Sequence, residues 1–88
     1  MVSKDFTITN KMGLHMRPAQ VFVTAMAKYP ADITIKFNGK DINGKSIMNI
    51  MAACIKCGSD ITVVCSGENE EAMLAEAASM IESGFGEE

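Results

Sequence analysis

The single histidine of the sequence, His15, lies in the segment GLHMRPA, residues 13–19. A helix is predicted to begin directly after it, and the unpaired amide groups and the dipole of a first helical turn form an anion site. Arg17 adds a planar, permanently charged guanidinium that suits phosphate oxygens. A neutral imidazole nitrogen is a nucleophile near pH 7. Together these features are what phosphoryl transfer requires, although a lone histidine is more often an ordinary surface residue.

Ser46 precedes a predicted helix over residues 47–55 and suits its N-cap, where a serine oxygen accepts a hydrogen bond from a first-turn amide. The simplest interpretation is a helix cap, worth about 1 kcal/mol. The same position also tolerates a phosphate, because roughly two negative charges at a helix N-terminus interact favourably with the helix dipole. On the local sequence alone, the helix cap is favoured over any such modification.

The three cysteines are an odd number, which is a poor basis for a secreted disulfide scaffold. Cys54 and Cys57 form a lone C-x-x-C, a spacing typical of a redox pair or of half a metal site. A four-ligand zinc site would need all three cysteines and His15. Cys65 lies in an alternating run and is expected to point inward. We expect free thiols, buried or half-buried, and no metal centre.

Hydrophobic periodicity predicts seven elements in the order βαββαβα. Strands are expected over residues 2–9, 33–38, 40–43 and 61–66, with Asn38-Gly39 as a type I′ hairpin turn. Helices are expected over 16–28, over 47–55 with Gly58 as the stop signal, and from the cap Asn69 to Gly84. The simplest packing is an α+β domain with all three helices on one face of the sheet and the other face open to water.

Each predicted helix carries one apolar stripe that is expected to pack on the sheet. In the second helix this stripe leaves Met48 pointing outward. The residues expected on the three stripes are Ala19, Phe22, Val23 and Met26, then Ile47, Ile50, Met51 and Cys54, and finally Leu74, Ala77, Ala78 and Ile81.

The composition is that of one small globular domain, residues 1–88, with one modest core. Eight basic against eleven acidic side chains give a net charge of −3, which argues against a nucleic-acid partner. No apolar run is long enough for a signal peptide or a membrane span, so a cytoplasmic protein is expected. Eight methionines without a tryptophan are unusual, and methionine is frequent on surfaces that bind several partners.

Three segments carry a resemblance that covers the whole chain: GLHMRPA at 13–19, NGKSIM at 43–48 and GSDIT at 58–62. Together they resemble the HPr family, the histidine-containing phosphocarriers of the bacterial phosphoenolpyruvate-dependent sugar phosphotransferase system. The resemblance implies an open-faced β-sandwich with antiparallel strands in the order 1-4-2-3. It implies that His15 accepts a phosphoryl group on Nδ1 from phospho-Enzyme I and passes it to sugar-specific IIA components, with Arg17 stabilising the phosphate.

The resemblance further implies a stoichiometric carrier, not an enzyme, that works as a monomer without cofactor, metal or membrane. In Gram-positive relatives the serine matching Ser46 is phosphorylated by HPr kinase/phosphorylase. We expect this modification to slow transfer from Enzyme I and to create a surface for a catabolite-control transcription regulator. Met16 and Met48 are expected to be exposed beside His15. The full set of expected docking residues is Met16, Gln20, Thr24, Ile47, Met48 and Met51.

Three residues depart from the usual family pattern: Met16 between the histidine and the arginine, and Asn49 and Cys54 where glycine is common. Three other functions compete with the carrier. A regulator of the same fold acting through Ser46 alone would lack the histidine. A redox or metal module would use Cys54, Cys57 and His15 but leave Arg17 without a role. A carrier of a nitrogen-related branch would typically lack the context of Ser46.

Overall fold

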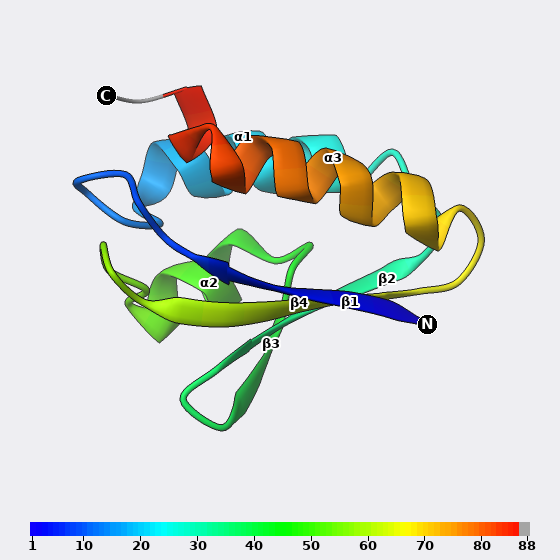
Figure 1. Ribbon diagram of the computed structural model, residues 1–88, viewed down its shortest axis with the longest axis horizontal. Coiled ribbons are helices and arrows are strands. Elements are labelled where there is room, and N and C mark those ends of the chain that lie inside the picture. Colours follow the sequence, from blue (N-terminus) through cyan, green and yellow to red (C-terminus); the bar gives the residue numbers. More distant parts are fainter. Residues whose placement is uncertain (87–88) are drawn as a thin grey trace.

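The computed structural model describes residues 1–86 and arranges them in a sheet layer and a helical layer (Figure 1). The helices are α1 (Met16–Met26), α2 (Ile47–Ala53) and α3 (Glu70–Glu82), followed by a short 3-10 helix, η1 (Gly84–Gly86). The strands are β1 (Val2–Thr7), β2 (Asp32–Phe37), β3 (Lys40–Asn43) and β4 (Asp60–Ser66). The predicted order βαββαβα is confirmed, with one added turn of 3-10 helix.

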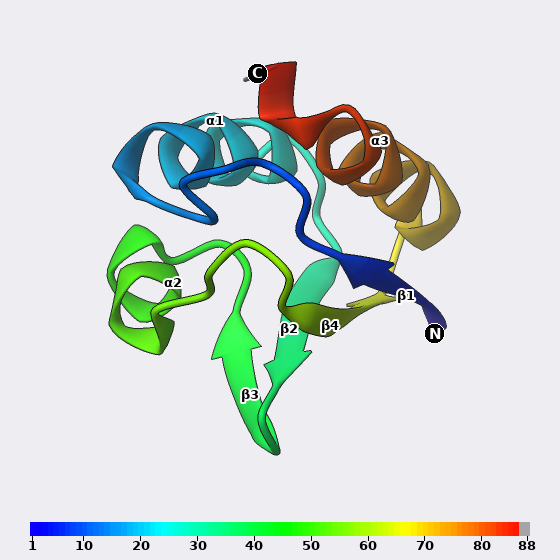
Figure 2. The same cartoon turned by 60° about the vertical axis from the view of Figure 1, so that its left-hand side comes forward.

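The four strands form one sheet in the order β1-β4-β2-β3, and every neighbouring pair is antiparallel. The three helices lie over one face of this sheet (Figures 1 and 2). The open-faced α+β architecture and the strand order expected from the sequence are therefore confirmed. None of the helices within residues 1–86 is long and apolar enough to cross a membrane.

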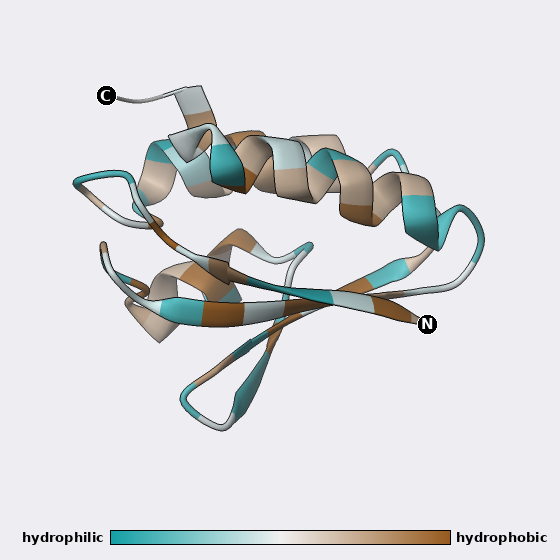
Figure 3. Cartoon of the chain, viewed as in Figure 1, coloured by the Kyte–Doolittle hydropathy of each residue, from teal (hydrophilic) through white to brown (hydrophobic). Residues whose placement is uncertain are grey.

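Alternation along the strands decides which face meets the helices (Figure 3). On β4, Ile61, Val63 and Cys65 are buried, whereas the strand ends Asp60 and Ser66 are exposed. The period of two places one set of side chains under the helices and the other set in solvent. The sheet thus forms one side of a single core.

The hairpin between β2 and β3 has the predicted two-residue turn. Phe37 pairs with Lys40, and between them Asn38 (φ 51°) and Gly39 (φ 76°) both adopt positive φ. Two positive φ values are what a type I′ turn requires, and its twist matches that of the flanking strands. The turn therefore fixes the register of this edge of the sheet.

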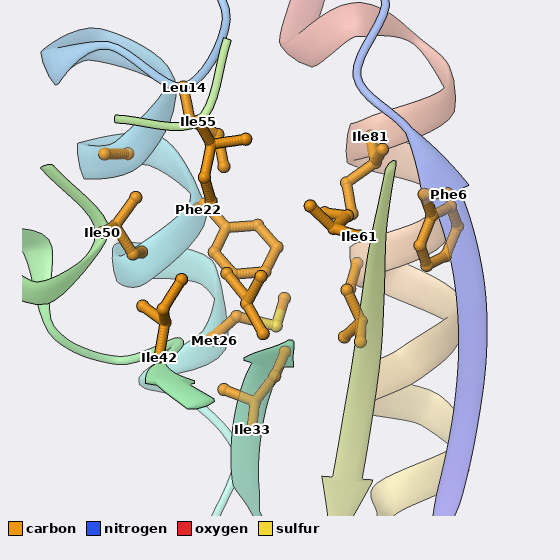
Figure 4. Packing of buried hydrophobic residues seen from close by; sticks show 14 of the residues in the cluster. Phe6, Leu14, Phe22, Met26, Ile33, Ile42, Ile50, Ile55, Ile61 and Ile81 are labelled. Atoms are coloured by element: carbon orange, nitrogen blue, oxygen red, sulfur yellow. The ribbon is translucent and has the colours of Figure 1, made fainter. Parts of the chain in front are cut away.

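The core is one cluster of buried side chains between the layers (Figure 4). From α1 it receives Ala19, Phe22 and Met26, as predicted, while Val23 is half-buried. On α3 the buried residues are Met73, Ala77 and Ile81. Of the predicted stripe, Ala77 and Ile81 are buried, whereas Leu74 and Ala78 are half-buried against the core. The prediction missed Met73, which the rotation of the helix turns fully into the core.

The boundaries of α2 differ from the prediction. The helix ends at Ala53, and Cys54 follows in the left-handed conformation (φ 54°, ψ 50°), so the helix stops well before Gly58. A residue at this position usually is glycine, because a Cβ disfavours left-handed backbone by roughly 1–2 kcal/mol. A cysteine at such a position gives no sequence signal for a helix end.

The short helix α2 packs against α1 and the edge strand β3. Ile50 is fully buried, Ile47 and Met51 are half-buried, and Cys54 is exposed. These four residues were expected to share one apolar face of the helix, and Cys54 alone of them does not lie on the covered side. The exposure of Cys54 and Cys57 also corrects the expectation of buried or half-buried thiols, whereas Cys65 is buried as expected.

Two further boundaries moved inward. β1 ends at Thr7 and α1 at Met26, two residues before the predicted ends. Asn69 occupies the N-cap position of α3, but with φ 63° its side chain makes no capping hydrogen bond. Glu70 instead accepts a hydrogen bond from the amide of Gly67 (3.0 Å), which closes the turn before the helix.

A polar contact joins the segment after α1 to the middle of α3. The Tyr29 hydroxyl donates to Glu76 Oε1 (2.6 Å), and Lys28 Nζ lies 3.1 Å from Glu76 Oε2. The hydrogen bond from Tyr29, and then Lys28, lower the pKa of Glu76, and the same bond raises the pKa of Tyr29. The contact holds the C-terminal end of α1 against α3.

This contact predicts an acid-dependent stability difference for Tyr29→Phe, which removes the hydroxyl. The folded-state pKa of Glu76 is depressed, so its stabilisation is complete above the unfolded pKa and is lost as pH falls through the folded pKa. Urea unfolding should show wild type more stable than Tyr29→Phe near neutral pH, with the difference shrinking in acid. A difference that grows in acid would contradict this assignment.

Candidate functional site

The N-terminus of α1 presents His15 and Arg17 together. His15 is the N-cap residue, with extended backbone (φ −82°, ψ −170°), and Met16 and Arg17 are the first two helical residues. Pro18, in the first turn, has no amide hydrogen to satisfy and is buried. The first-turn amide groups and the helix dipole therefore face the same solvent-exposed end as the imidazole and the guanidinium.

The loop that delivers His15 to this position is held by backbone contacts. The Leu14 amide donates to the carbonyl of Ile55 (2.9 Å), and Asn10 Nδ2 donates to the carbonyl of Gly13 (2.6 Å). Gly13 has φ 66°, and a Cβ on it would lie 2.5 Å from the Ile55 carbonyl oxygen. No residue with a side chain fits there without moving the backbone, which explains the glycine.

A hollow opens on the surface around His15. It is lined by Lys11, Met12, His15, Met16, Arg17, Gln20 and Gly86. Two of these side chains, Lys11 and Arg17, carry positive charge, and neither makes a salt bridge among the ion pairs of residues 1–86. The hollow is open and positively charged, and these properties suit the binding of an anion.

Lys11 and Gly86 were missed in the sequence. The signal for Lys11 was available, since a basic residue in the turn before a candidate phosphate-binding histidine adds to the charge of Arg17. Gly86 gave no signal, because its place depends on how η1 folds back beside α1 after α3. Local sequence motifs do not detect residues that reach a site from a distant part of the sequence.

Ser46 caps α2 as predicted. Its Oγ accepts a hydrogen bond from the Asn49 amide (3.2 Å), and its backbone is extended. The preceding residue is tied down, because Lys45 Nζ donates to the carbonyl of Tyr29 (2.6 Å) and the Lys45 amide donates to Asn43 Oδ1 (2.9 Å). Ser46 is half-exposed at the start of the helix. The Ser46 hydroxyl thus caps the helix and is also accessible to solvent.

The expected docking residues lie on two neighbouring helices, α1 and α2 (Figure 2). Met16 is 50% exposed and Met48 82% exposed, so the predicted exposure of both is confirmed. Gln20 and Thr24 are also exposed, and Ile47 and Met51 are half-buried. Met16, Gln20 and Thr24 are spaced by four residues and share one side of α1. Their role in docking stays a prediction.

The zinc alternative finds no support in the geometry. Within residues 1–86, no three His, Cys, Asp or Glu side chains gather where they could hold one metal ion. Cys65 lies in the core on β4, where burial raises the pKa of its thiol. Cys54 and Cys57 lie at the surface between α2 and β4. The three cysteines that a zinc site would need are therefore divided between the surface and the core.

Comparison with known proteins agrees with this arrangement. The family model described as "PTS HPr component phosphorylation site" matches residues 2–83. The chain belongs to the HPr family. The phosphocarrier protein HPr of Borreliella burgdorferi is 37% identical over 83 residues, which make up 94% of this chain and 96% of that protein. The family expected from the three sequence segments is thereby confirmed.

Solved HPr structures show the same fold. HPr-C-His from Thermoanaerobacter tengcongensis superposes with a TM-score of 0.96 at 38% identity, covering 100% of this chain and 99% of that one. HPr from Bacillus anthracis gives a TM-score of 0.86 at 40% identity, covering 91% of this chain and 95% of that one. As an HPr, the chain is a phosphocarrier of the phosphotransferase system and not an enzyme.

The packing of Gly13 predicts that the His15 loop tolerates no side chain there. Gly13→Ala adds a methyl group onto the Ile55 carbonyl, whereas Gly39→Ala, at a similar positive φ (76°), meets no atom within 4 Å. Gly39→Ala should lose about 1 kcal/mol of unfolding free energy, from backbone strain alone. Gly13→Ala should lose at least about 2 kcal/mol, because displaced backbone adds to that strain.

Chemical denaturation of the two variants and the wild type measures this difference. Equal losses would show that the approach of Gly13 to Ile55 is unimportant for the loop.

Proposed function

We propose that His15 is the phosphoryl acceptor and donor of this carrier. The supporting observation is the convergence of His15, Arg17 and Lys11 around one open hollow at the N-terminus of α1. In the proposed step, the Nδ1 lone pair of a neutral imidazole attacks phosphorus while Nε2 keeps its proton. The bond from phosphorus to the phospho-Enzyme I donor breaks as the P–N bond forms, and the reverse occurs on a IIA component.

Arg17 and Lys11 would stabilise the charge on the transferring group. A guanidinium binds two phosphate oxygens at once, and an ammonium adds a mobile positive charge. The first-turn amides and the dipole of α1 supply further positive potential from fixed positions. Because these groups are in place before the partner arrives, little reorganisation accompanies the transfer.

The partners would dock on the surface formed by α1 and α2 around His15. Met16 and Met48 offer exposed, flexible apolar side chains, which adapt to different partner surfaces. Gln20, Thr24, Ile47 and Met51 would complete the contact. A carrier that meets Enzyme I and several IIA components in turn must keep this surface free, so we expect a monomer acting in the cytoplasm.

Ser46 would be the regulatory site, phosphorylated by HPr kinase/phosphorylase. A phosphate on Oγ adds about two negative charges at the N-terminus of α2, where the fold tolerates them. The same charge would lie next to the exposed Met48, within the apolar surface proposed for Enzyme I. We therefore expect slower transfer to His15 and a new acidic surface for a catabolite-control transcription regulator.

Phosphoenolpyruvate with Enzyme I tests the carrier role. One acid-labile, alkali-stable phosphate should appear on the wild type and on Ser46→Ala, and none on His15→Ala. Intact-protein mass spectrometry and acid lability measure both properties. A label that persists on a folded His15→Ala protein would place the phosphoryl group elsewhere and end the proposal.

HPr kinase with ATP tests the regulatory role. An acid-stable phosphate should form on the wild type and on His15→Ala but not on Ser46→Ala. Ser46→Asp should slow phosphorylation of His15 by Enzyme I severalfold, because its charge opposes docking, while the neutral near-isostere Ser46→Asn should not. Equal rates for the Asp and Asn variants would show that charge at position 46 has no effect on transfer.

A further inference from the structure

Two exposed thiols, Cys54 and Cys57, have no role in phosphoryl transfer as described above. They are free, they lie at the surface, and their spacing is that of redox-active dithiols. The third thiol, Cys65, is 0% exposed in the core. The protein thus carries one pair of solvent-accessible thiols and one buried thiol that is protected from solvent.

The segment between the two thiols supports the loop that carries His15. The Ile55 carbonyl, one residue after Cys54, accepts the hydrogen bond of the Leu14 amide (2.9 Å). A Cβ on Gly13 would lie 2.5 Å from the same carbonyl oxygen and 2.7 Å from Lys56 Cα. Residues 55 and 56 are therefore pressed directly against the two residues that precede His15.

Residues 57–59, which follow this segment, make further contacts with residues 8 and 9. The Cys57 thiol lies 3.6 Å from the Thr9 carbonyl and donates to it. The Gly58 amide donates to the Ile8 carbonyl (2.7 Å), and the Ile8 amide donates to the Ser59 carbonyl (2.9 Å). Residues 54–59 and 8–14 therefore form one hydrogen-bonded unit. The two thiols lie in the first of these segments, and His15 directly follows the second.

A bridge between the two thiols would act on this unit. A disulfide requires its two Cα atoms to lie about 4.4–6.8 Å apart and restricts the backbone between them. In the reduced protein the two thiols lie against different carbonyls, Cys54 Sγ 3.8 Å from that of Met51 and Cys57 Sγ 3.6 Å from that of Thr9, and the residues between them form no turn, so closing the bridge must move this backbone. The enclosed residues are Ile55 and Lys56, which contact Leu14 and Gly13. The left-handed backbone of Cys54 (φ 54°) places one end of the bridge at a strained position that can change conformation. Closing the bridge would therefore disturb the support of His15.

We propose that Cys54 and Cys57 form a reversible disulfide that slows phosphoryl transfer by displacing the His15 loop. The oxidant is a low-molecular-weight disulfide. One thiolate attacks it to form a mixed disulfide and releases one small thiol. The second cysteine then displaces the other, so that two protein thiols are oxidised and one small disulfide is reduced to two thiols, which take the two protons. A small dithiol reverses the reaction.

The modification itself is measured with glutathione disulfide as the oxidant on the folded full chain. Intact mass should fall by about 2 Da and return after treatment with dithiothreitol. Cys54→Ser and Cys57→Ser should instead gain one glutathione each, because neither can close the bridge. Mixed glutathione adducts on the wild type without a loss of mass would overturn the proposal.

The effect on the carrier is measured in two ways, of which only the second rests on His15 being the proposed phosphoryl acceptor. Hydrogen exchange of the Leu14 amide should accelerate in the oxidised protein and remain slow in the oxidant-treated double variant Cys54→Ser/Cys57→Ser. Phosphorylation by Enzyme I should slow severalfold on oxidation, recover on reduction, and be insensitive to oxidant in the double variant.

These readouts separate the two proposals. A reduced wild type that accepts no phosphoryl group from Enzyme I refutes the carrier role, while the mass and exchange measurements still decide the disulfide. Unchanged Leu14 exchange or an unchanged transfer rate in the bridged protein would overturn the coupling between the thiols and His15.

Discussion

The contact between the Leu14 amide and the Ile55 carbonyl is the constraint on which the site depends. It joins the loop before α1 to the connection between α2 and β4, so that two segments about forty residues apart form one support. Gly13 lies so close to the same carbonyl that a side chain is excluded. His15, the next residue after Leu14, is therefore positioned by backbone packing and not by the conformational preference of its own side chain.

This support lets a small domain act without a deep pocket. The core beneath it is one cluster shared by the sheet and the helices, and it fixes α1 relative to α2. The N-terminus of α1 then holds an imidazole, a guanidinium and the ammonium of Lys11 around an open hollow. Under the proposed function, the partners would supply catalytic assistance, while this end of α1 would supply the positively charged groups that hold the phosphoryl group.

The architecture could be predicted because local signals agreed with the global packing. Strand alternation, the type I′ turn at Asn38-Gly39 and the cap at Ser46 all follow from chemistry within a few residues, and all were found. The candidate site could be predicted for the same reason, since His15 and Arg17 lie within one motif. Recognition of the family then supplied the strand order, which periodicity alone does not give.

Features that arise from tertiary contact could not be predicted. Cys54 adopts left-handed backbone directly before Ile55, which binds the His15 loop, and cysteine has no preference for that conformation. The rotation of α3 that buries Met73 is set by packing on the sheet, since the helix offers apolar residues on more than one side. The approach of Gly86 to His15 depends on the turn of η1. The exposure of Cys57 depends on its position in the connection between α2 and β4.

The central claim is that the imidazole at the N-terminus of α1 carries the phosphoryl group, with Arg17 and Lys11 beside it. Long-range ¹H–¹⁵N correlation spectroscopy of the protein phosphorylated by Enzyme I identifies the modified atom directly. The account predicts phosphorus bound to Nδ1 of His15 and a proton on Nε2, with accompanying shift changes at Arg17 and Lys11. A phosphate on Nε2, or His15 resonances that do not change when the protein gains phosphate, would contradict it.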